Sequence, residues 1–160
     1  MPNRIHIIGG PGSGKSTLAR KLAAENGLPH VELDALFWND AGGHYDVRRD
    51  PGERDRRLAK LADGASWVIE GVYYSWCRPS FERAEQIILL DTPTWLRHWR
   101  LGLRFIKRKL GIEPKGQSRK KDSFKGYWDI TKWNARWDRD NLAGAKEALG
   151  SFEEKLKIMR

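Results

Sequence analysis

The feature that most constrains the fold is a glycine-rich octet near the start of the chain, Gly9-Gly10-Pro11-Gly12-Ser13-Gly14-Lys15-Ser16. The short apolar run at residues 5–8 precedes it and is typical of a buried parallel strand. After the octet, apolar residues recur at helical spacing as far as Asn26, and Gly27 supplies the stop. A strand, a tight loop and a helix in this order predict the first unit of an α/β sheet.

The octet also matches the motif G-x-x-x-x-G-K-[S/T], whose mechanism is understood. Consecutive backbone N–H groups of such a loop surround a phosphate, and side chains at the glycine positions would block that approach. The following helix adds its N-terminal N–H groups and its dipole. We expect Lys15 to reach the β- and γ-phosphates of Mg-ATP, and the Ser16 hydroxyl to ligate Mg²⁺. The predicted nucleotide-binding residues are Gly9, Gly10, Pro11, Gly12, Ser13, Gly14, Lys15, Ser16 and Thr17.

The rest of the chain alternates predicted strands and helices. Strands are expected at residues 30–34, 67–69 and 86–90, while residues 155–159 form either a fifth strand or a helix end. Asp50, Pro51 and Glu53 predict the start of a helix that ends near residue 63. Further helices are expected at about 94–110 and 123–149. This order predicts an α/β protein of three layers, with a parallel sheet covered on both faces, and a single domain over residues 1–160.

Carboxylates stand at the ends of three predicted strands, and ligands of such sheets bind beyond those ends. Asp34 is expected to accept the proton of a substrate hydroxyl or to hold Mg²⁺ through water, with a turn aspartate as the alternative. Glu70 is the expected acidic partner of Mg²⁺, while Asp91 looks like helix-start chemistry. Trp38, close to Asp34, is expected to stack on the substrate.

Positive charge is concentrated in the second half of the chain. The net charge is +9, and residues 1–90 sum to zero with 12 basic and 12 acidic residues, so the whole excess lies in residues 91–160. Such an excess suits a polyanion, either the phosphates of a nucleotide or a nucleic-acid backbone, and a solvated basic surface is the alternative.

One predicted helix carries a stripe of four arginines. They are spaced three, four and four residues apart, away from the apolar stripe of the same helix, and no acid occurs between Thr92 and Ile112. Arginines without acidic neighbours suit the charge that develops on a transferring phosphoryl group. We expect Arg100 and Arg104 to act in catalysis with Lys15 and Asp34. The arginine stripe is Arg97, Arg100, Arg104 and Arg108, and the apolar stripe is Leu96, Trp99, Leu103, Ile106 and Leu110.

The next predicted helix carries three tryptophans at near-helical spacing. We predict that these are core residues: Trp128, Trp133 and Trp137.

The number of cysteines and the hydropathy of the chain indicate the cellular compartment. Cys77 is the only cysteine, so an internal disulfide is excluded. No apolar run approaches the roughly 18 residues of a membrane-spanning helix. The start of the chain does not resemble a signal peptide. We therefore expect a cytoplasmic protein without a membrane partner.

With these residues in place, the chain resembles the P-loop kinases of the nucleoside monophosphate kinase and shikimate kinase type, and within them the small adenylate-kinase-related DNA topology modulation proteins. The resemblance implies a P-loop NTPase fold with strand order 2-3-1-4-5, a substrate-binding insertion at about 35–65, a helical lid at about 100–122, and ATP as donor. The family follows its third strand with Asp-Gly-x-Pro-Arg, which this chain lacks, and Arg78 is the expected substitute for the arginine that grips the acceptor. The resemblance rests on the octet, on residues 33–38 and 67–71, and on 87–91 before the arginine-bearing helix.

Two functions from different classes follow. The first is an ATP-dependent phosphotransferase acting on a nucleotide, a nucleoside or another hydroxylated metabolite. The alternative is a nucleotide-binding regulator that holds nucleic acid through its basic C-terminal half, including residues 119–121. An NTPase without an acceptor ranks lowest, because no glutamine or asparagine clearly stands ready to position water.

Overall fold

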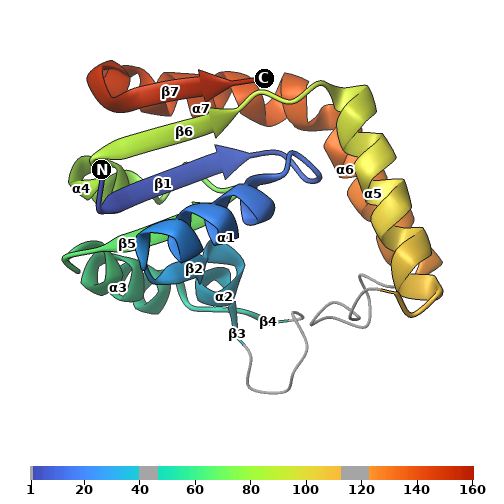
Figure 1. The fold of residues 1–160 in the computed structure, drawn as a ribbon, viewed down its shortest axis with the longest axis horizontal. Helices are drawn as coiled ribbons and strands as arrows, with labels where there is room; N and C mark the ends of the chain where they lie inside the picture. The colour runs from blue at the N-terminus through green and yellow to red at the C-terminus, as the bar shows by residue number, and fades with distance from the viewer. Residues whose placement is uncertain (1, 40–46, 113–122) are drawn as a thin grey trace.

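The computed structural model describes residues 2–39, 47–112 and 123–160. Its centre is a five-stranded parallel sheet in the order β2-β5-β1-β6-β7 (Figure 1). Numbered within this sheet alone, the order is 2-3-1-4-5, as predicted. The strands are β1 (Arg4–Gly9), β2 (His30–Glu32), β5 (Trp67–Gly71), β6 (Gln86–Leu90) and β7 (Leu156–Met159).

Helical segments and a small hairpin connect these strands. The hairpin pairs β3 (Trp38–Asn39) with β4 (Val47–Arg48) in antiparallel fashion and was not predicted. The α-helices are α1 (Lys15–Asn26), α2 (Leu33–Phe37), α3 (Pro51–Ala62), α4 (Arg78–Arg83), α5 (Thr94–Lys109), α6 (Phe124–Trp137) and α7 (Ala143–Leu149). A π-helical segment, η2 (Asp138–Leu142), joins α6 to α7, and a 3₁₀ segment, η3 (Gly150–Lys155), leads into β7.

The two faces of the sheet bury separate apolar clusters, as side-chain alternation along strands requires. On one face, residues such as Ile7 and Val68 pack with Ala19 and Ala23 of α1. On the other, Ile69 and Leu89 belong to a cluster that includes Leu58 of α3, Phe81 of α4 and Leu149 of α7. Helices on both faces of a parallel sheet confirm the predicted three-layer α/β/α fold.

Two helix ends confirm their sequence signals. The Asp50 carboxylate accepts a hydrogen bond of 2.9 Å from the backbone N–H of Glu53, so Asp50 caps α3 as predicted. Gly27 ends α1 with a φ of 65°, a left-handed conformation that glycine adopts without strain.

The helix predicted at 123–149 is present as the contiguous helical run of α6, η2 and α7, with a π-helical segment at Asp138–Leu142, but two of its three predicted core tryptophans are exposed. Trp137 is buried, whereas Trp128 and Trp133 are exposed. The reason is the position of α6, which packs along α5 outside the sheet layers (Figure 1). Only its end reaches the loop after β1, where Trp137 lies against Gly10.

Helices α5 and α6 run side by side beyond the end of the sheet to which β1 points (Figure 1). The expected insertion and lid are described only in part, because residues 40–46 and 113–122, including the basic residues at 119–121, lie outside the described residues. Among the helices that the structure describes, none is both long and apolar enough to cross a membrane.

Candidate phosphate-binding site

The glycine-rich loop joins β1 to α1 and packs closely against α5 and α6. A Cβ on Gly10 would lie 2.7 Å from Nη1 of Arg97 and 2.9 Å from Cδ1 of Trp137. Gly12 has a φ of 75°, and a Cβ there would lie 2.6 Å from the carbonyl oxygen of Arg97. Glycine at these positions is therefore required by packing within the protein, in addition to the predicted approach of a phosphate.

Two side chains hold the carbonyl of Ser13 in this loop. The buried Thr92 hydroxyl donates to it at 3.2 Å, and Nη1 of Arg100 donates at 2.9 Å. Thr92 does not cap the helix that follows, because Pro93 occupies the N-cap position of α5, without a side-chain cap. Thr92 and Arg100 thus tie the loop to the end of β6 and to α5.

Ser16, in the first turn of α1, meets Glu70 at the end of β5. Its hydroxyl donates to Oε1 of Glu70 at 2.6 Å, and Glu70 is 3% exposed. The structure therefore brings together the two residues predicted to hold a metal. Hydroxyl and carboxylate oxygens are the ligands that Mg²⁺ prefers, so this pair fits that ion. Lys15, the first residue of α1, is half-buried beside them.

Two residues of β2 join this group and were missed from the sequence. His30 Nε2 lies 3.9 Å from Oε1 of Glu70, and ligand atoms of His30, Glu32 and Glu70 all lie within 4.8 Å of one another. The register explains this, because Glu32 pairs with Glu70 in neighbouring parallel strands and so shares its face. The alternation of polar residues at 30, 32 and 34 was the available signal.

Asp34 lies in the first turn of α2, next to a cluster of aromatic rings. Tyr73 donates a hydrogen bond of 3.0 Å to Oδ1 of Asp34. Burial, and then the Asp34 carboxylate, raise the pKa of Tyr73, so the phenol keeps its proton. Tyr73 stacks on Phe37 at 4.7 Å, and Phe37 in turn contacts the edge of Trp38 at 4.9 Å. The substrate roles of Asp34 and Trp38 stay predictions.

The arginines of α5 take different positions. Arg97 is 1% exposed, and its Nη2 donates to Asp138 at 2.7 Å and to Thr94 at 3.0 Å, so this arginine is part of the packing. Arg100 contacts the loop, as described above. Arg104 lies one turn further along the helix and is exposed. The catalytic roles of Arg100 and Arg104 stay predictions.

The two remaining predicted residues, Asp91 and Arg78, form ion pairs with other parts of the protein. Asp91 pairs with Lys146 at 3.4 Å, in keeping with a structural role. Arg78 is exposed and pairs with Glu82 at 2.9 Å within α4, which lies beside the start of β1 in Figure 1. The acceptor role predicted for Arg78 gains no support from this position.

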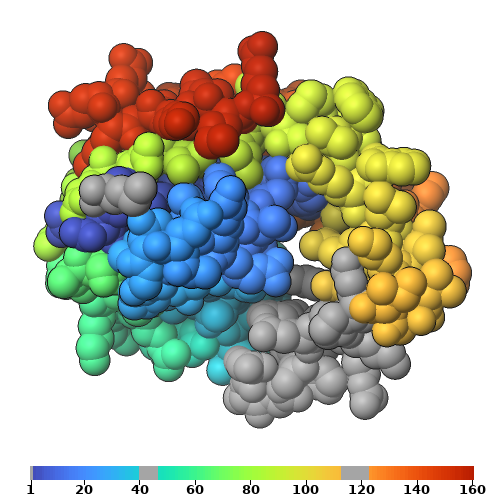
Figure 2. Space-filling model, viewed as in Figure 1, coloured from blue at the N-terminus to red at the C-terminus, as the bar shows by residue number. Residues whose placement is uncertain are grey.

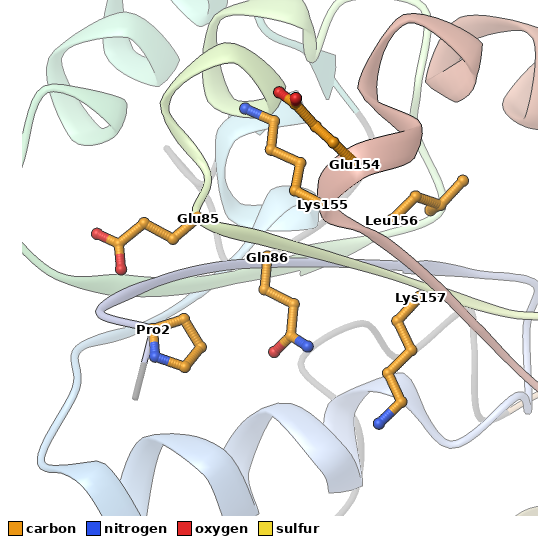
Figure 3. Close-up of a pocket in the computed structure, with 7 residues that line it drawn as sticks. All are labelled: Pro2, Glu85, Gln86, Glu154, Lys155, Leu156 and Lys157. Atoms are coloured by element: carbon orange, nitrogen blue, oxygen red, sulfur yellow. The ribbon is translucent and has the colours of Figure 1, made fainter.

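Figure 2 shows an open space between the surfaces of α1 and α5, on the side of the molecule that carries the loop. A second, shallow hollow lies at the starts of β6 and β7 (Figure 3). The acidic Glu85 and Glu154 there accompany the basic Lys155 and Lys157. Because this hollow lies at the opposite ends of the strands from the loop, it is not part of the phosphate-binding site.

Comparison with curated proteins finds kinases among the relatives. The chain is 29% identical to a cytidylate kinase of Aeropyrum pernix over 78% of this chain and 79% of that protein. It is 26% identical to the uncharacterized protein YqaC of Bacillus subtilis over 93% of this chain and 80% of that protein. A shikimate kinase of Paracidovorax citrulli is 51% identical over 39 residues, which are 24% of this chain and 21% of that protein. No family model matches the chain.

Solved structures share the fold at low sequence identity. A shikimate kinase from Bacteroides thetaiotaomicron has a TM-score of 0.54 at 16% identity, covering 99% of this chain and 85% of that one. A sugar kinase from a Janibacter species has a TM-score of 0.52 at 17% identity, covering 99% of this chain and 85% of that one. A gluconokinase from Sinorhizobium meliloti has a TM-score of 0.51 at 17% identity, covering 98% of this chain and 81% of that one. The fold, the loop and the sequence relatives together support a kinase of the P-loop family, and they do not single out the topology modulation proteins within it.

Proposed function

We propose that this chain is a phosphotransferase that moves the γ-phosphate of Mg-ATP to a small acceptor, which is a nucleotide, a nucleoside or another hydroxylated metabolite. The observation that carries the proposal is the hydrogen bond between Ser16 and Glu70. It joins the start of α1, where a phosphate would bind, to a buried carboxylate that suits a metal. A glycine-rich turn with only a structural role does not need that carboxylate.

Each residue of the site then has a task. Backbone N–H groups of Gly9–Ser16 hold the phosphates, and the ammonium of Lys15 neutralises charge on the transferred group. Ser16 and Glu70 hold Mg²⁺, which neutralises further charge on the phosphates when bound. Arg100 already contacts the loop through Ser13 and is the arginine best placed to serve the phosphoryl group.

Asp34 serves the acceptor. Its carboxylate takes the proton of the acceptor hydroxyl as that oxygen attacks the γ-phosphorus and ADP leaves. The hydrogen bond from Tyr73 fixes the orientation of Asp34, and the rings of Phe37 and Trp38 form an apolar wall beside it. A lid at residues 100–122, closing over ATP, would exclude water, which competes with the acceptor.

The acceptor is best identified with a panel of candidates. Purified protein is incubated with γ-labelled ATP and nucleoside monophosphates, nucleosides or small hydroxylated metabolites, and label transferred to each compound is measured. Lys15→Ala and Asp34→Ala are the paired variants. We expect one compound class to gain label with wild type, and both variants to lose that transfer.

The regulator of nucleic acid is the competing outcome of the same experiment. No transfer to any acceptor, together with tight duplex DNA binding that weakens with added salt, would favour the regulator. Arg97 and Arg100 of α5 give that function no specific support, because Arg97 is buried against Asp138 and Arg100 is bonded to Ser13.

A further inference from the structure

Helix α5 exposes a continuous stripe of large apolar side chains. These residues are between 38% and 71% exposed, and their spacing of four, four, three and four residues puts them on one helical face. Isolated exposed apolar residues are ordinary, but a stripe of this size on one face marks an interaction surface. The stripe, called the outer stripe below, consists of Trp95, Trp99, Leu103, Ile106 and Leu110.

Within the described ranges, the contacts that hold α5 in place come from faces of the helix other than the outer stripe. On the opposite side of the helix, Arg97 and Leu101 are buried against the phosphate loop, where a Cβ on Gly12 would lie 3.1 Å from Leu101. On a third side, Phe105 stacks on Tyr127 of α6 at 4.6 Å. Among the residues that the structure describes, α5 is therefore anchored through its other faces, and none of them covers the outer stripe.

Positive charge borders the outer stripe. Between Thr94 and Lys109 the helix carries six Lys and Arg residues and no Asp or Glu. At 3.6 residues per turn, Lys107 and Lys109 lie about 40° beyond the two edges of the stripe. The Lys109 ammonium also lies 5.2 Å from the centre of the Phe124 ring. Phe124 and Trp128 are both exposed residues of α6. Apolar and aromatic groups flanked by lysines thus continue from α5 onto α6.

From this pattern we infer that the outer stripe docks on an anionic lipid bilayer, lying in its surface without crossing it. Tryptophan and aliphatic side chains enter the boundary between headgroups and acyl chains, while flanking lysines reach the acidic headgroups. A second copy of the chain fits less well, because it would bring the ammonium groups of Lys107 and Lys109 from both copies to the edges of one shared apolar surface. Nucleic acid would satisfy the lysines but leave the apolar groups in water.

The inference goes beyond the proposed phosphotransfer and departs from the expectation of no membrane partner. The two surfaces of α5 are compatible, because Arg97 and Arg100 turn toward the phosphate loop while the outer stripe turns away from it. Docking would therefore leave the loop side of the helix free to act.

Flotation with lipid vesicles tests the inference. The full chain is mixed with vesicles of phosphatidylcholine alone, or of equal parts phosphatidylcholine and phosphatidylglycerol, and the bound fraction is measured. We expect binding to the mixed vesicles with a blue shift of tryptophan fluorescence, and little binding to neutral ones. The double variant Trp99→Ser/Ile106→Ser should weaken binding at least about tenfold. The double variant Lys107→Gln/Lys109→Gln should weaken it at low salt and remove most of its salt dependence.

Ile158→Ser is the matched control, since Ile158 is an exposed apolar residue on β7, and it should bind as wild type does. Circular dichroism establishes that each variant is folded. Equal vesicle binding by wild type and the Trp99/Ile106 variant would overturn the inference, as would no binding to either vesicle. Sedimentation equilibrium showing a dimer that this variant dissociates would assign the stripe to a second copy instead. Binding to duplex DNA that needs the lysines alone would assign the surface to nucleic acid.

Discussion

The Ser16 hydroxyl donates a hydrogen bond of 2.6 Å to the buried carboxylate of Glu70. Ser16 lies in the first turn of α1, after the glycine-rich loop, and Glu70 lies near the end of β5, more than fifty residues later in the chain. Their contact makes the loop and the strand end a single structural unit. It also sets a hydroxyl and a carboxylate side by side at the end of the sheet where ligands of α/β folds bind.

Glu70→Gln preserves the size of the side chain and removes its charge. We expect phosphoryl transfer to fall about 10- to 100-fold and the concentration of Mg²⁺ needed for half-maximal turnover to rise, because a metal partner is weakened. Titration of turnover with Mg²⁺ measures both effects. The control is Glu82→Gln, which changes the carboxylate of the exposed ion pair with Arg78 and should leave the Mg²⁺ dependence of turnover unchanged. An unaltered Mg²⁺ dependence in Glu70→Gln would remove Glu70 from the site.

Arg100→Ala separates binding from catalysis. Because Arg100 is proposed to stabilise charge on the transferred phosphoryl group, its loss should lower kcat about 10²- to 10³-fold. ATP affinity should change little, because Thr92 also holds the Ser13 carbonyl of the loop. Steady-state kinetics and calorimetric ATP binding provide the two readouts. Arg136→Ala changes an exposed arginine of α6 and is the control. If turnover is unchanged in both Arg100→Ala and Arg104→Ala, α5 has no catalytic arginine of the kind proposed.

Tyr73→Phe removes one hydroxyl and keeps the ring stack with Phe37. A hydrogen bond to a charged carboxylate is worth about 1.5–3 kcal/mol, so we expect kcat/KM for the acceptor to fall about tenfold or more. The KM for ATP should stay constant, since Tyr73 contacts Asp34 and not the loop. Tyr74→Phe is the neighbouring control. Wild-type kinetics in Tyr73→Phe would show that Asp34 needs no orientation by Tyr73.

His6 makes stability depend on pH. Burial lowers the pKa of His6 to about 3, from an ordinary value near 6.5. Below about pH 6.5, His6 binds a proton in the unfolded chain but stays neutral in the folded chain. The free energy of unfolding therefore falls as the pH falls from about 6.5 to about 3. This group alone contributes a slope of up to about 1.4 kcal/mol per pH unit. Urea denaturation of wild type and His6→Met at pH 7 and pH 5 should give the smaller loss in the variant; equal losses would contradict the assignment.

Local patterns in the sequence predicted the parts of the fold that depend on neighbouring residues. The octet, the apolar strands and the capping box at Asp50 each place their signal within a few positions, so the central strands, α1 and the start of α3 could be predicted. The strand order was implied by the resemblance to P-loop kinases, and Ser16 and Glu70 were predicted as metal ligands without their hydrogen bond. Other features depend on partners far along the chain. Arg97 is buried in an ion pair with Asp138, and the residue spacing within α5 does not predict this ion pair.

The orientation of α5 was the hardest feature to predict. Apolar stripes usually face a core, yet here the side with Arg97 and Leu101 faces the loop and the outer stripe faces outward. His30 and Glu32 were missed for a related reason, since their closeness to Glu70 depends on the register of β2 against β5.

The measurement that tests the central claim most directly is the formation of ADP from ATP with and without the acceptor found in the panel. If the chain is a phosphotransferase, the acceptor should stimulate ADP formation, each ADP should be matched by one phosphorylated acceptor, and Lys15→Ala should abolish both. ADP formation that the acceptor does not change, with phosphate released to water, would contradict the account.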